Sequence, residues 1–399
     1  MTEPPEISFV LHAYQPPYPA QDPKVVERII QNCYDPFFRQ LLSSRKKITL
    51  NINGVLLETL EMDSPQTISL IQECADEGLI EFLGSGAYHP IFPLLISKEN
   101  RYEQIKLNFE ISRRILGNVY EPHGFFPPEL AVSDWFVREI ADSGFQYIIV
   151  PQNSVPLMHR DLFPYMRSKT SSAKITLLPR NRDISNRLAF RHFGNEISLF
   201  LSGMKQIHEA LETPPSLLAM DIETFGEHHS GYLKFLFRLL DKCNNLTGRE
   251  LVEKVSDYEI TTLRSSSWST SDNDLEQNPF PLWASPDNAI HGLLGTHFAL
   301  LDSVERILAN DTHIKEKDLK EFRLQHLRSQ FSCQLWWASG DGRWGPKIVQ
   351  AGLEMQRDTL RFALESAYKE HRDSVLKEFL GISDQILEAV ERAILYRKK

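Results

Sequence analysis

The densest group of ionisable residues lies at positions 221–229, where Asp221, Glu223, Glu227, His228 and His229 occur close together. Side chains two positions apart project from the same face of a strand, so we predict that Asp221 and Glu223 crowd one side and that their pKa values are driven apart. One carboxyl then stays protonated near neutral pH while the other is ionised. That division suits general acid–base chemistry.

The same segment is a poor match to a metal site. His228 and His229 are adjacent in the sequence and cannot both point into one pocket from a strand. Neither an H-E-x-x-H motif nor an EF-hand loop occurs in the sequence. We therefore predict no metal and no other cofactor.

A further carboxyl, Glu129, follows two prolines at the end of the apolar run Gly124–Phe126. The prolines fix the backbone just before it, so the carboxylate is presented on a rigid segment and is positioned for chemistry. The alternative is that Glu129 caps the next helix or meets solvent, as most glutamates do.

Two histidines also follow apolar runs. His12 and Tyr14 come directly after Phe9–Leu11, and His89 follows a glycine-containing turn at 84–86. The turn lacks the full G-x-G-x-x-G pattern and is followed by prolines, so we exclude a phosphate-binding loop. A histidine after a strand is also a common hydrogen-bonded structural residue, and the sequence leaves both interpretations open.

Aromatic residues gather near the C-terminal end of this series. Trp336 and Trp337 precede a Gly-rich stretch that contains Asp341, and Trp268 and Trp283 lie in or just beyond an earlier turn-rich stretch. Tryptophan beside glycine and aspartate is one way to stack on sugar rings, which have C–H faces and hydroxyl edges. Core packing is the alternative for each tryptophan.

These clusters come where short apolar runs end. Such runs alternate with helix-like segments, which is typical of strand–helix units around a parallel sheet, and parallel strands assemble sites at their carboxyl ends. The predicted strands are Ile7–Leu11, Ile48–Ile52, Ile80–Leu83, Gly124–Phe126, Tyr147–Val150, Ile175–Leu178 and Ala219–Ile222. The predicted helices are Pro23–Ser43, Ser64–Glu77, Glu99–Leu116, Asp134–Ser143, Gly203–Leu211 and Tyr232–Asn244.

The sequence pattern changes at about Arg264. Residues 264–287 are rich in turn formers, and we predict a linker or surface loop there, after an α/β body at 1–263. Residues 288–399 are predicted to form a helical bundle. Its long amphipathic helices are Asn288–Ala309, Glu316–Trp337, Lys347–Lys369 and Val375–Arg397.

Charge and composition exclude several classes of protein. The chain of 399 residues has a formal net charge of −9, so it offers no basic face for nucleic acid. No apolar run approaches the ~18 residues of a membrane span, and the acidic, proline-containing start does not resemble a secretory signal. The four cysteines form no C-x-x-C pair, which fits a reducing compartment, so we expect a cytoplasmic protein.

Taken in order, the clusters resemble glycoside hydrolase family 57, a retaining family that acts on α-glucans. Glu129 falls at the family's nucleophile block and Asp221 at its general-acid block, in a form similar to α-amylase and amylopullulanase members. The other blocks that carry the resemblance are His12–Pro16, Asn51–Glu58, Tyr88–Ile91 and Trp336–Asp341.

The resemblance implies an irregular seven-stranded (β/α) barrel followed by a helical domain that closes over the active site. It also implies double displacement at an α-1,4-glucosidic bond of an oligo- or polysaccharide, with Glu129 attacking the anomeric carbon. Asp221 would protonate the leaving oxygen and then activate water or an acceptor hydroxyl. Retention requires these carboxyls to be ~5–5.5 Å apart in space, although they are 92 positions apart in sequence.

By the same resemblance, His12, His89 and His228 would hydrogen-bond sugar hydroxyls, and Trp336 or Trp337 would stack on a ring. Tyr14 replaces the second histidine of the family's opening block. The remaining residues expected to bind substrate are Glu223, Trp283 and Asp341.

Three other functions stay open at this stage. A 4-α-glucanotransferase or branching enzyme would use the same chemistry, with only water exclusion and acceptor binding to separate it from a hydrolase. A catalytically silent carbohydrate-binding protein could keep the barrel. A metal-dependent deacetylase or mannosidase-like barrel is the third alternative, and oligomeric state is left open.

Overall fold

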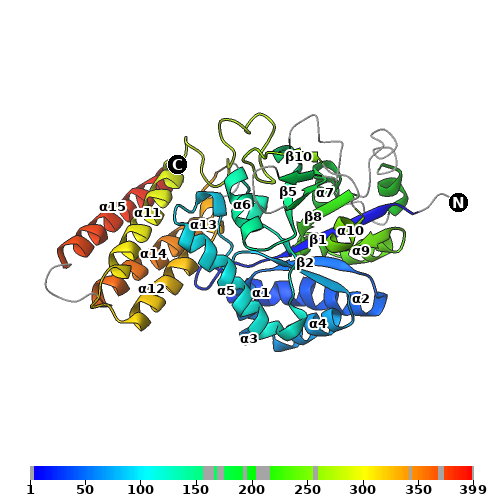
Figure 1. Cartoon of the computed structure of the whole chain (residues 1–399), viewed down its shortest axis with the longest axis horizontal. Coiled ribbons are helices and arrows are strands. Elements are labelled where there is room, and N and C mark those ends of the chain that lie inside the picture. Colours follow the sequence, from blue (N-terminus) through cyan, green and yellow to red (C-terminus); the bar gives the residue numbers. More distant parts are fainter. Residues whose placement is uncertain are drawn as a thin grey trace.

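The computed structural model describes residues 4–155, 166–168, 175–191, 196–203, 216–254, 259–340, 344–366 and 373–397. An α/β body carries the N-terminus, and a group of long helices lies beside it at the end of the chain (Figure 1). None of the described helices combines the length and apolarity that a membrane span needs.

The body is a nearly closed barrel of seven parallel strands in the order β7-β5-β4-β3-β2-β1-β8. Between β7 and β8, the Asn181 amide donates to the Leu217 carbonyl oxygen at 2.8 Å. All seven predicted strands are therefore confirmed, with shifts of up to three residues at their ends. They are β1 (Glu6–Ala13), β2 (Ile48–Ile52), β3 (Ile80–Gly84), β4 (Gly124–Phe125), β5 (Tyr147–Pro151), β7 (Thr176–Arg180) and β8 (Ser216–Asp221).

The strands are apolar almost throughout because both faces of a parallel barrel strand are covered, one by the barrel interior and one by helices. The pairing register then brings polar residues together at the carboxyl ends. His12 of β1 lies opposite Asn51 of β2 on one side and opposite Asp221 of β8 on the other.

Three short strands extend this sheet and are not predicted from the sequence. β6 (Met166–Ser168) pairs antiparallel with β7, and β10 (Glu259–Thr261) pairs parallel with β6. β9 (Asn244–Leu246) pairs with β1, so the predicted helix Tyr232–Asn244 ends earlier, at Leu240.

Helices cover the outside of the barrel (Figure 1). The predicted helix Pro23–Ser43 is interrupted by a π-helical turn at Ile30–Tyr34, because Pro36 near the start of the following helix has no N–H to donate to the preceding turn. The barrel helices are α1 (Pro23–Ile29), α2 (Asp35–Ser44), α3 (Gly54–Asp63), α4 (Pro65–Asp76), α5 (Lys98–Leu116), α6 (Asp134–Asp142), α7 (Arg182–Phe190), α9 (Tyr232–Leu240) and α10 (Gly248–Glu253).

Several of these helices differ from the prediction. α3, α7 and α10 are not predicted. The pattern does not reveal α3 because its first residues form an almost continuous apolar run rather than an apolar stripe with helical spacing. A helix is described at 197–203, and most of the predicted helix Gly203–Leu211 lies outside the described residues.

The C-terminal helices pack on one another in a group beside the barrel (Figure 1). They confirm the four predicted segments with one break, after Ser329. Two carbonyl groups at this break, those of Ser329 and Phe331, accept hydrogen bonds from the Gln334 side chain. The helices are α11 (Ala289–Ala309), α12 (Glu316–Ser329), α13 (Cys333–Trp336), α14 (Pro346–Ser366) and α15 (Asp373–Arg397).

The segment 264–287, predicted to be a linker or surface loop, is packed against the barrel. Ser266 pairs with Val132 through two backbone hydrogen bonds, and Ser267, Thr270 and Trp283 are buried. No helix or strand is assigned within 264–287, in agreement with its turn-rich sequence. Its packing places side chains of this segment at the carboxyl ends of the barrel strands, which an exposed linker would not do.

Candidate functional site

The carboxyl ends of four barrel strands position the candidate site. His12 lies near the end of β1, Arg180 and Asp221 are the last residues of β7 and β8, and Glu129 follows β4 in the turn Pro128–Leu130. Since parallel strands end at one edge, these side chains converge although they are far apart in the sequence.

The backbone at Glu129 has an unusual conformation. Its φ is 58° and that of Leu130 is 48°, in the left-handed region that non-glycine residues seldom occupy. Short-range hydrogen bonds hold the turn, and the Trp268 amide donates to the Glu129 carbonyl oxygen at 3.1 Å. A strained residue held in this way at a strand end is typical of functional sites.

Two donors face the Glu129 carboxyl group. Trp268 Nε1–H donates to Oε2 at 2.8 Å, and the Ser332 hydroxyl approaches Oε1 at 3.5 Å. Burial raises the pKa of Glu129 to about 8, the Asp221 charge adds to the rise, and the two donors oppose it. The Asp221 effect places the two carboxyls within electrostatic reach of each other.

Asp221 is partly buried, and this desolvation raises its pKa, while the Arg180 charge opposes the rise. Arg180 is itself buried and donates to the Ala219 carbonyl oxygen at 2.7 Å and to Asn186 Oδ1 at 2.8 Å. Its guanidinium also lies 5.8 Å from the Trp268 ring centre. Burial lowers the pKa of Arg180 to about 10, so the group remains a cation at neutral pH.

Glu223 lies beside this pair, in the 3-10 turn Ile222–Phe225 rather than on the strand. The prediction that Asp221 and Glu223 share one strand face is therefore wrong, because β8 ends at Asp221. Burial and then the Asp221 charge raise the pKa of Glu223. Its carboxylate accepts hydrogen bonds from the Tyr34 hydroxyl and the Gln15 side chain.

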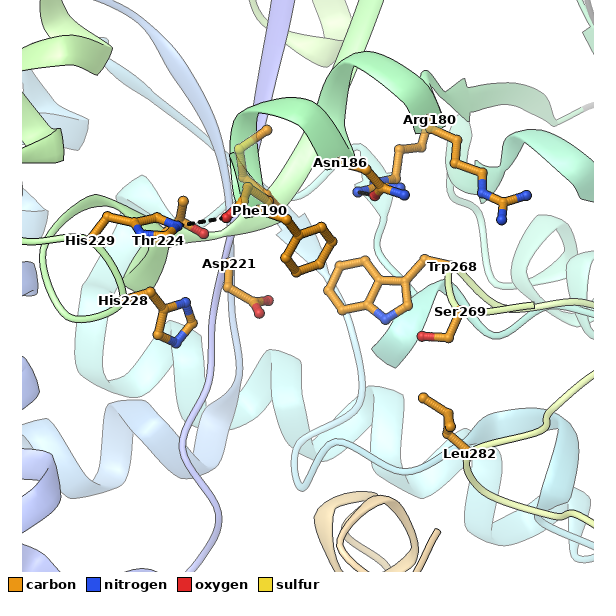
Figure 2. Close-up of a pocket in the computed structure, with 13 residues that line it drawn as sticks. Arg180, Asn186, Phe190, Asp221, Thr224, His228, His229, Trp268, Ser269 and Leu282 are labelled. Carbon is orange, nitrogen blue, oxygen red and sulfur yellow. Dashed lines mark hydrogen bonds between the residues drawn. The ribbon is translucent and has the colours of Figure 1, made fainter. Parts of the chain in front are cut away.

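A cavity of about 520 Å³ opens beside Asp221. Figure 2 shows the Asp221 carboxylate directed into the space between His228 and Trp268, with the Phe190 ring on the same wall. The lining residues are Arg180, Arg182, Asn186, Ala189, Phe190, Met220, Asp221, Thr224, His228, His229, Trp268, Ser269 and Leu282. Charged, polar and aromatic groups therefore face one space of a size that suits a small ligand or part of a chain.

Both adjacent histidines reach this cavity, contrary to the prediction from strand geometry. His228 and His229 lie in the turn after β8, where the alternation of a strand does not apply. His228 has an exposed side chain, but desolvation by the protein around its ring still lowers its pKa. The His229 ring is hydrogen-bonded to the Ala189 carbonyl oxygen at 2.9 Å.

His12, Tyr14 and His89 form a stack of rings behind Glu129. The Tyr14 and His89 ring centres are 3.7 Å apart, and those of His12 and His89 are 4.9 Å apart. Each histidine uses both ring nitrogens in hydrogen bonds to protein groups, with partners Asn51, Ser332 and each other. The predicted hydrogen bonds from His12 and His89 to sugar hydroxyls are therefore not available in this arrangement.

The tryptophans predicted from the sequence lie elsewhere. Trp283 is only 1% exposed, inside an apolar cluster between the barrel and the C-terminal helices, and presents no open ring face. Trp336 and Trp337 are partly buried against the same cluster and do not line the cavity, and Trp337 packs on Gly345. Asp341 lies outside the described residues.

Four residues of the site were not predicted. Trp268 stood out in the sequence only as a tryptophan in a turn-rich stretch. Arg180 ends β7, two residues beyond the predicted strand, and Phe190 ends α7, which was not predicted. Ser332 carries no local signal, because its role depends on a contact with His89 across 243 positions of sequence.

Known proteins resemble this chain in sequence. The profile of glycosyl hydrolase family 57 matches residues 9–263. An α-amylase of Pyrococcus horikoshii is 26% identical over 282 residues, which are 66% of this chain and 43% of that protein. A 4-α-glucanotransferase of Thermococcus litoralis is 24% identical over 262 residues, which are 61% of this chain and 38% of that protein. The aligned part is thus less than half of each relative.

Solved structures extend the likeness to the fold of almost the whole chain. The crystal structure of a branching enzyme of family 57 from Thermococcus kodakaraensis has a TM-score of 0.73 at 17% identity, covering 97% of this chain and 95% of that one. The family profile covers more than half of the residues, and the seven-stranded barrel agrees with it. The chain belongs to glycosyl hydrolase family 57.

Proposed function

We propose that this protein is a retaining enzyme that cleaves α-1,4-glucosidic bonds in glucans, with Glu129 as nucleophile and Asp221 as general acid and base. The observation that carries the proposal is the convergence of these two partly buried carboxyls at the carboxyl end of the barrel, where the charge of Asp221 raises the pKa of Glu129. The cavity beside Asp221 provides the space for a sugar.

In the first step, a Glu129 oxygen attacks the anomeric carbon while Asp221 gives its proton to the leaving glycosidic oxygen. In the second, Asp221 takes a proton from water, and the oxygen of that water displaces Glu129 from the anomeric carbon. The first step needs one proton on the pair, held by Asp221. The second step begins with Asp221 ionised and Glu129 esterified, and it restores that proton.

In the empty site that proton belongs on Glu129, because Arg180 faces Asp221 and favours its ionised form. The proton must therefore move to Asp221 when substrate is bound. The donors Trp268 and Ser332 assist this exchange, since a hydrogen bond to the ionised carboxylate stabilises it.

The cavity residues suggest how a sugar is held. The Trp268 indole N–H is hydrogen-bonded to Glu129, so the face of the indole ring offers a stacking surface next to the reacting carbon. His228 is an exposed donor and acceptor on the same cavity, and Glu223 accepts two hydrogen bonds that orient it near Asp221. Tyr14 packs behind Glu129 against His89.

The test is product analysis by mass spectrometry with end-labelled maltoheptaose, using an α-1,6-linked oligosaccharide and a Glu129→Gln variant as controls. We expect the wild-type protein to produce only chains shorter than the substrate, and the variant to form no product. Turnover by the variant would contradict the assignment of the nucleophile. No product over days, with oligosaccharide binding by calorimetry, would favour a binding protein instead.

A glucanotransferase or branching enzyme is the second candidate, supported by the relatives that bear those names. In that case the second step uses a sugar hydroxyl in place of water, and the same experiment yields chains both shorter and longer than the substrate. The cytoplasmic location remains a prediction.

A further inference from the structure

A continuous series of hydrogen bonds runs from the core of the barrel to Glu129. His12 Nδ1 lies 2.6 Å from Asn51 Oδ1, and His12 Nε2 lies 2.9 Å from His89 Nε2. His89 Nδ1 lies 2.7 Å from Ser332 Oγ, which is 3.5 Å from Glu129 Oε1. The two histidines are 4% and 1% exposed, so solvent does not supply alternative partners.

The chemistry of the two rings restricts how protons can be arranged. Burial lowers the pKa of His12 to about 4. Burial and then the neighbouring His12 lower the pKa of His89 well below its usual value, so both rings are neutral. A neutral imidazole has one donor and one acceptor nitrogen. In the contact between the two Nε2 atoms one ring must donate and the other accept, so the direction of one hydrogen bond sets all the others.

When Glu129 is protonated, its O–H donates to Ser332, Ser332 donates to His89 Nδ1, His89 Nε2–H donates to His12, and His12 Nδ1–H donates to Asn51 Oδ1. When Glu129 is ionised, every bond reverses, and Ser332 donates to the carboxylate. Each ring keeps one proton in both arrangements. The two arrangements differ by a single proton, which bulk water takes up.

Asn51 allows the reversal at the far end. It is fully buried, and its Nδ2 has no hydrogen-bond partner among the described residues. Turning the amide by half a revolution replaces the acceptor Oδ1 with the donor Nδ2 opposite His12. Either orientation leaves one end of the amide unpaired, so neither direction of the series is favoured by Asn51 alone.

We propose that His12, His89 and Ser332 form a reversible hydrogen-bond chain that positions Glu129 and inverts its direction when Glu129 loses its proton. The inference rests on the proposed function only in that Glu129 is taken as the nucleophile. The histidines are then positioning residues behind the reacting carboxyl and not sugar ligands, since all four of their ring nitrogens are occupied.

The chain itself is tested by NMR of the full-length protein with ¹⁵N-labelled histidine, with the signals of His12 and His89 assigned from His12→Gln and His89→Asn spectra. Asn at position 89 tolerates the positive φ of 57° found there. Between pH 6 and 10 we expect the protonated and unprotonated nitrogens of both rings to exchange roles, and Glu129→Gln to abolish this exchange. Rings that keep one tautomer throughout, or that become doubly protonated, would overturn the proposal.

Other titratable groups face Glu129 and need a control. Asp221, Tyr14 and Cys333 are its charged or ionisable neighbours. In Asp221→Asn, the protonated and unprotonated nitrogens of both rings must still exchange roles as Glu129 ionises. Loss of this exchange in Asp221→Asn would show that it follows the ionisation of Asp221 and would overturn the proposal. The NMR result does not depend on turnover, so failure of the chain and failure of the proposed function are distinguishable.

A kinetic test uses two buried serines of the same region. Ser332→Ala removes the link, and Ser329→Ala removes a hydroxyl that donates to the His326 carbonyl oxygen instead. We expect Ser332→Ala to lower kcat/KM about five- to tenfold and to move the alkaline limb of its pH profile upward, because ionised Glu129 loses a donor. Ser329→Ala should leave the limb unmoved. Equal profiles for both variants would overturn the proposal.

Discussion

Two partly buried groups of acids with histidines nearby lie in different parts of the molecule, and their charges are compensated differently. At the barrel end, burial raises the pKa of Glu129, Asp221 and Glu223, and the Arg180 charge opposes the rise only at Asp221. In the C-terminal helices, Glu305 pairs with Arg323 at 2.9 Å and with His326 at 3.3 Å.

In that second group, burial would raise the pKa of Glu305, but His326 and Arg323 outweigh it and the pKa is lowered. Asp302 completes the cluster, 3.5 Å from His326 and hydrogen-bonded to Asn100 of α5. Its three ligand-type atoms lie within 4.8 Å of one another, yet each already has a partner, so the cluster is satisfied without an ion. Burial still raises the pKa of Asp302, but both acids of this cluster have charged or hydrogen-bonding partners, which is typical of a structural group, whereas Asp221 at the barrel end faces a cavity.

The largest expected effect comes from breaking the barrel pair. Glu129→Gln should reduce kcat by about 10⁴-fold or more, since a nucleophile is lost, and Asp221→Asn by about 10²–10⁴-fold. Steady-state kinetics on maltoheptaose measure both. The matched control is Glu305→Gln in the helical cluster, which should leave kcat unchanged, and a comparable loss of kcat there would remove the distinction between the two groups.

Breaking the helical group should act on stability and not on chemistry. His326→Gln removes the partner that Asp302 and Glu305 share, while Asn100 and Arg323 remain, and we expect a loss of about 1–3 kcal/mol in the free energy of unfolding. Urea unfolding measures it, with activity assayed below the transition. A stable variant with impaired kcat would reverse the assignment of roles.

Exchanging the one cation of the barrel group sharpens the comparison. Arg180→Lys keeps the charge but loses the two-point hydrogen bonding to Ala219 and Asn186, so we expect kcat/KM to fall about tenfold. Arg180→Met removes the charge that opposes the rise in the pKa of Asp221 and should be worse, with the acidic limb of the pH profile moved upward. Equal activity of wild type and Arg180→Met would contradict this role.

The smallest effect is a difference in the pH dependence of stability. The folded pKa of Glu129, about 8, exceeds its unfolded value of about 4.3, so its contribution to stability is complete below pH 4.3 and is lost as pH rises through 8. Glu129→Gln should therefore raise Tm at pH 9 and not at pH 4. Glu305 has a lowered pKa, so Glu305→Gln should lower Tm at pH 7 and lose its effect at acid pH. Thermal unfolding across this range distinguishes the two signs.

The sequence predicts the barrel better than the site. Runs of apolar residues mark all seven barrel strands, because a strand covered on both faces has no polar face, and the positions of Glu129 and Asp221 follow from where those runs end. Local pattern does not reveal which side chains meet across long distances in sequence. Trp268 reaches Glu129 from a segment predicted to be a linker, and Ser332 reaches His89 through a break in a predicted helix.

The predicted sugar contacts of His12, His89 and Trp283 meet the same obstacle in the structure. Residue type showed that each could bind a sugar, but burial and competing partners decide whether it can. Trp283 is enclosed by the core, and the two histidines satisfy each other.

The central claim is that Glu129 forms a covalent bond to the sugar. The direct measurement is peptide mass spectrometry after treatment with a maltosyl fluoride that carries a second fluorine at C2 or C5 of the reacting ring, which slows release of the intermediate. Asp221→Asn should also be labelled, because fluoride leaves without protonation. We expect one added fluoromaltosyl group on the peptide containing Glu129. A label on Asp221 or Glu223, or turnover with inverted product and no label, would contradict the assignment of Glu129.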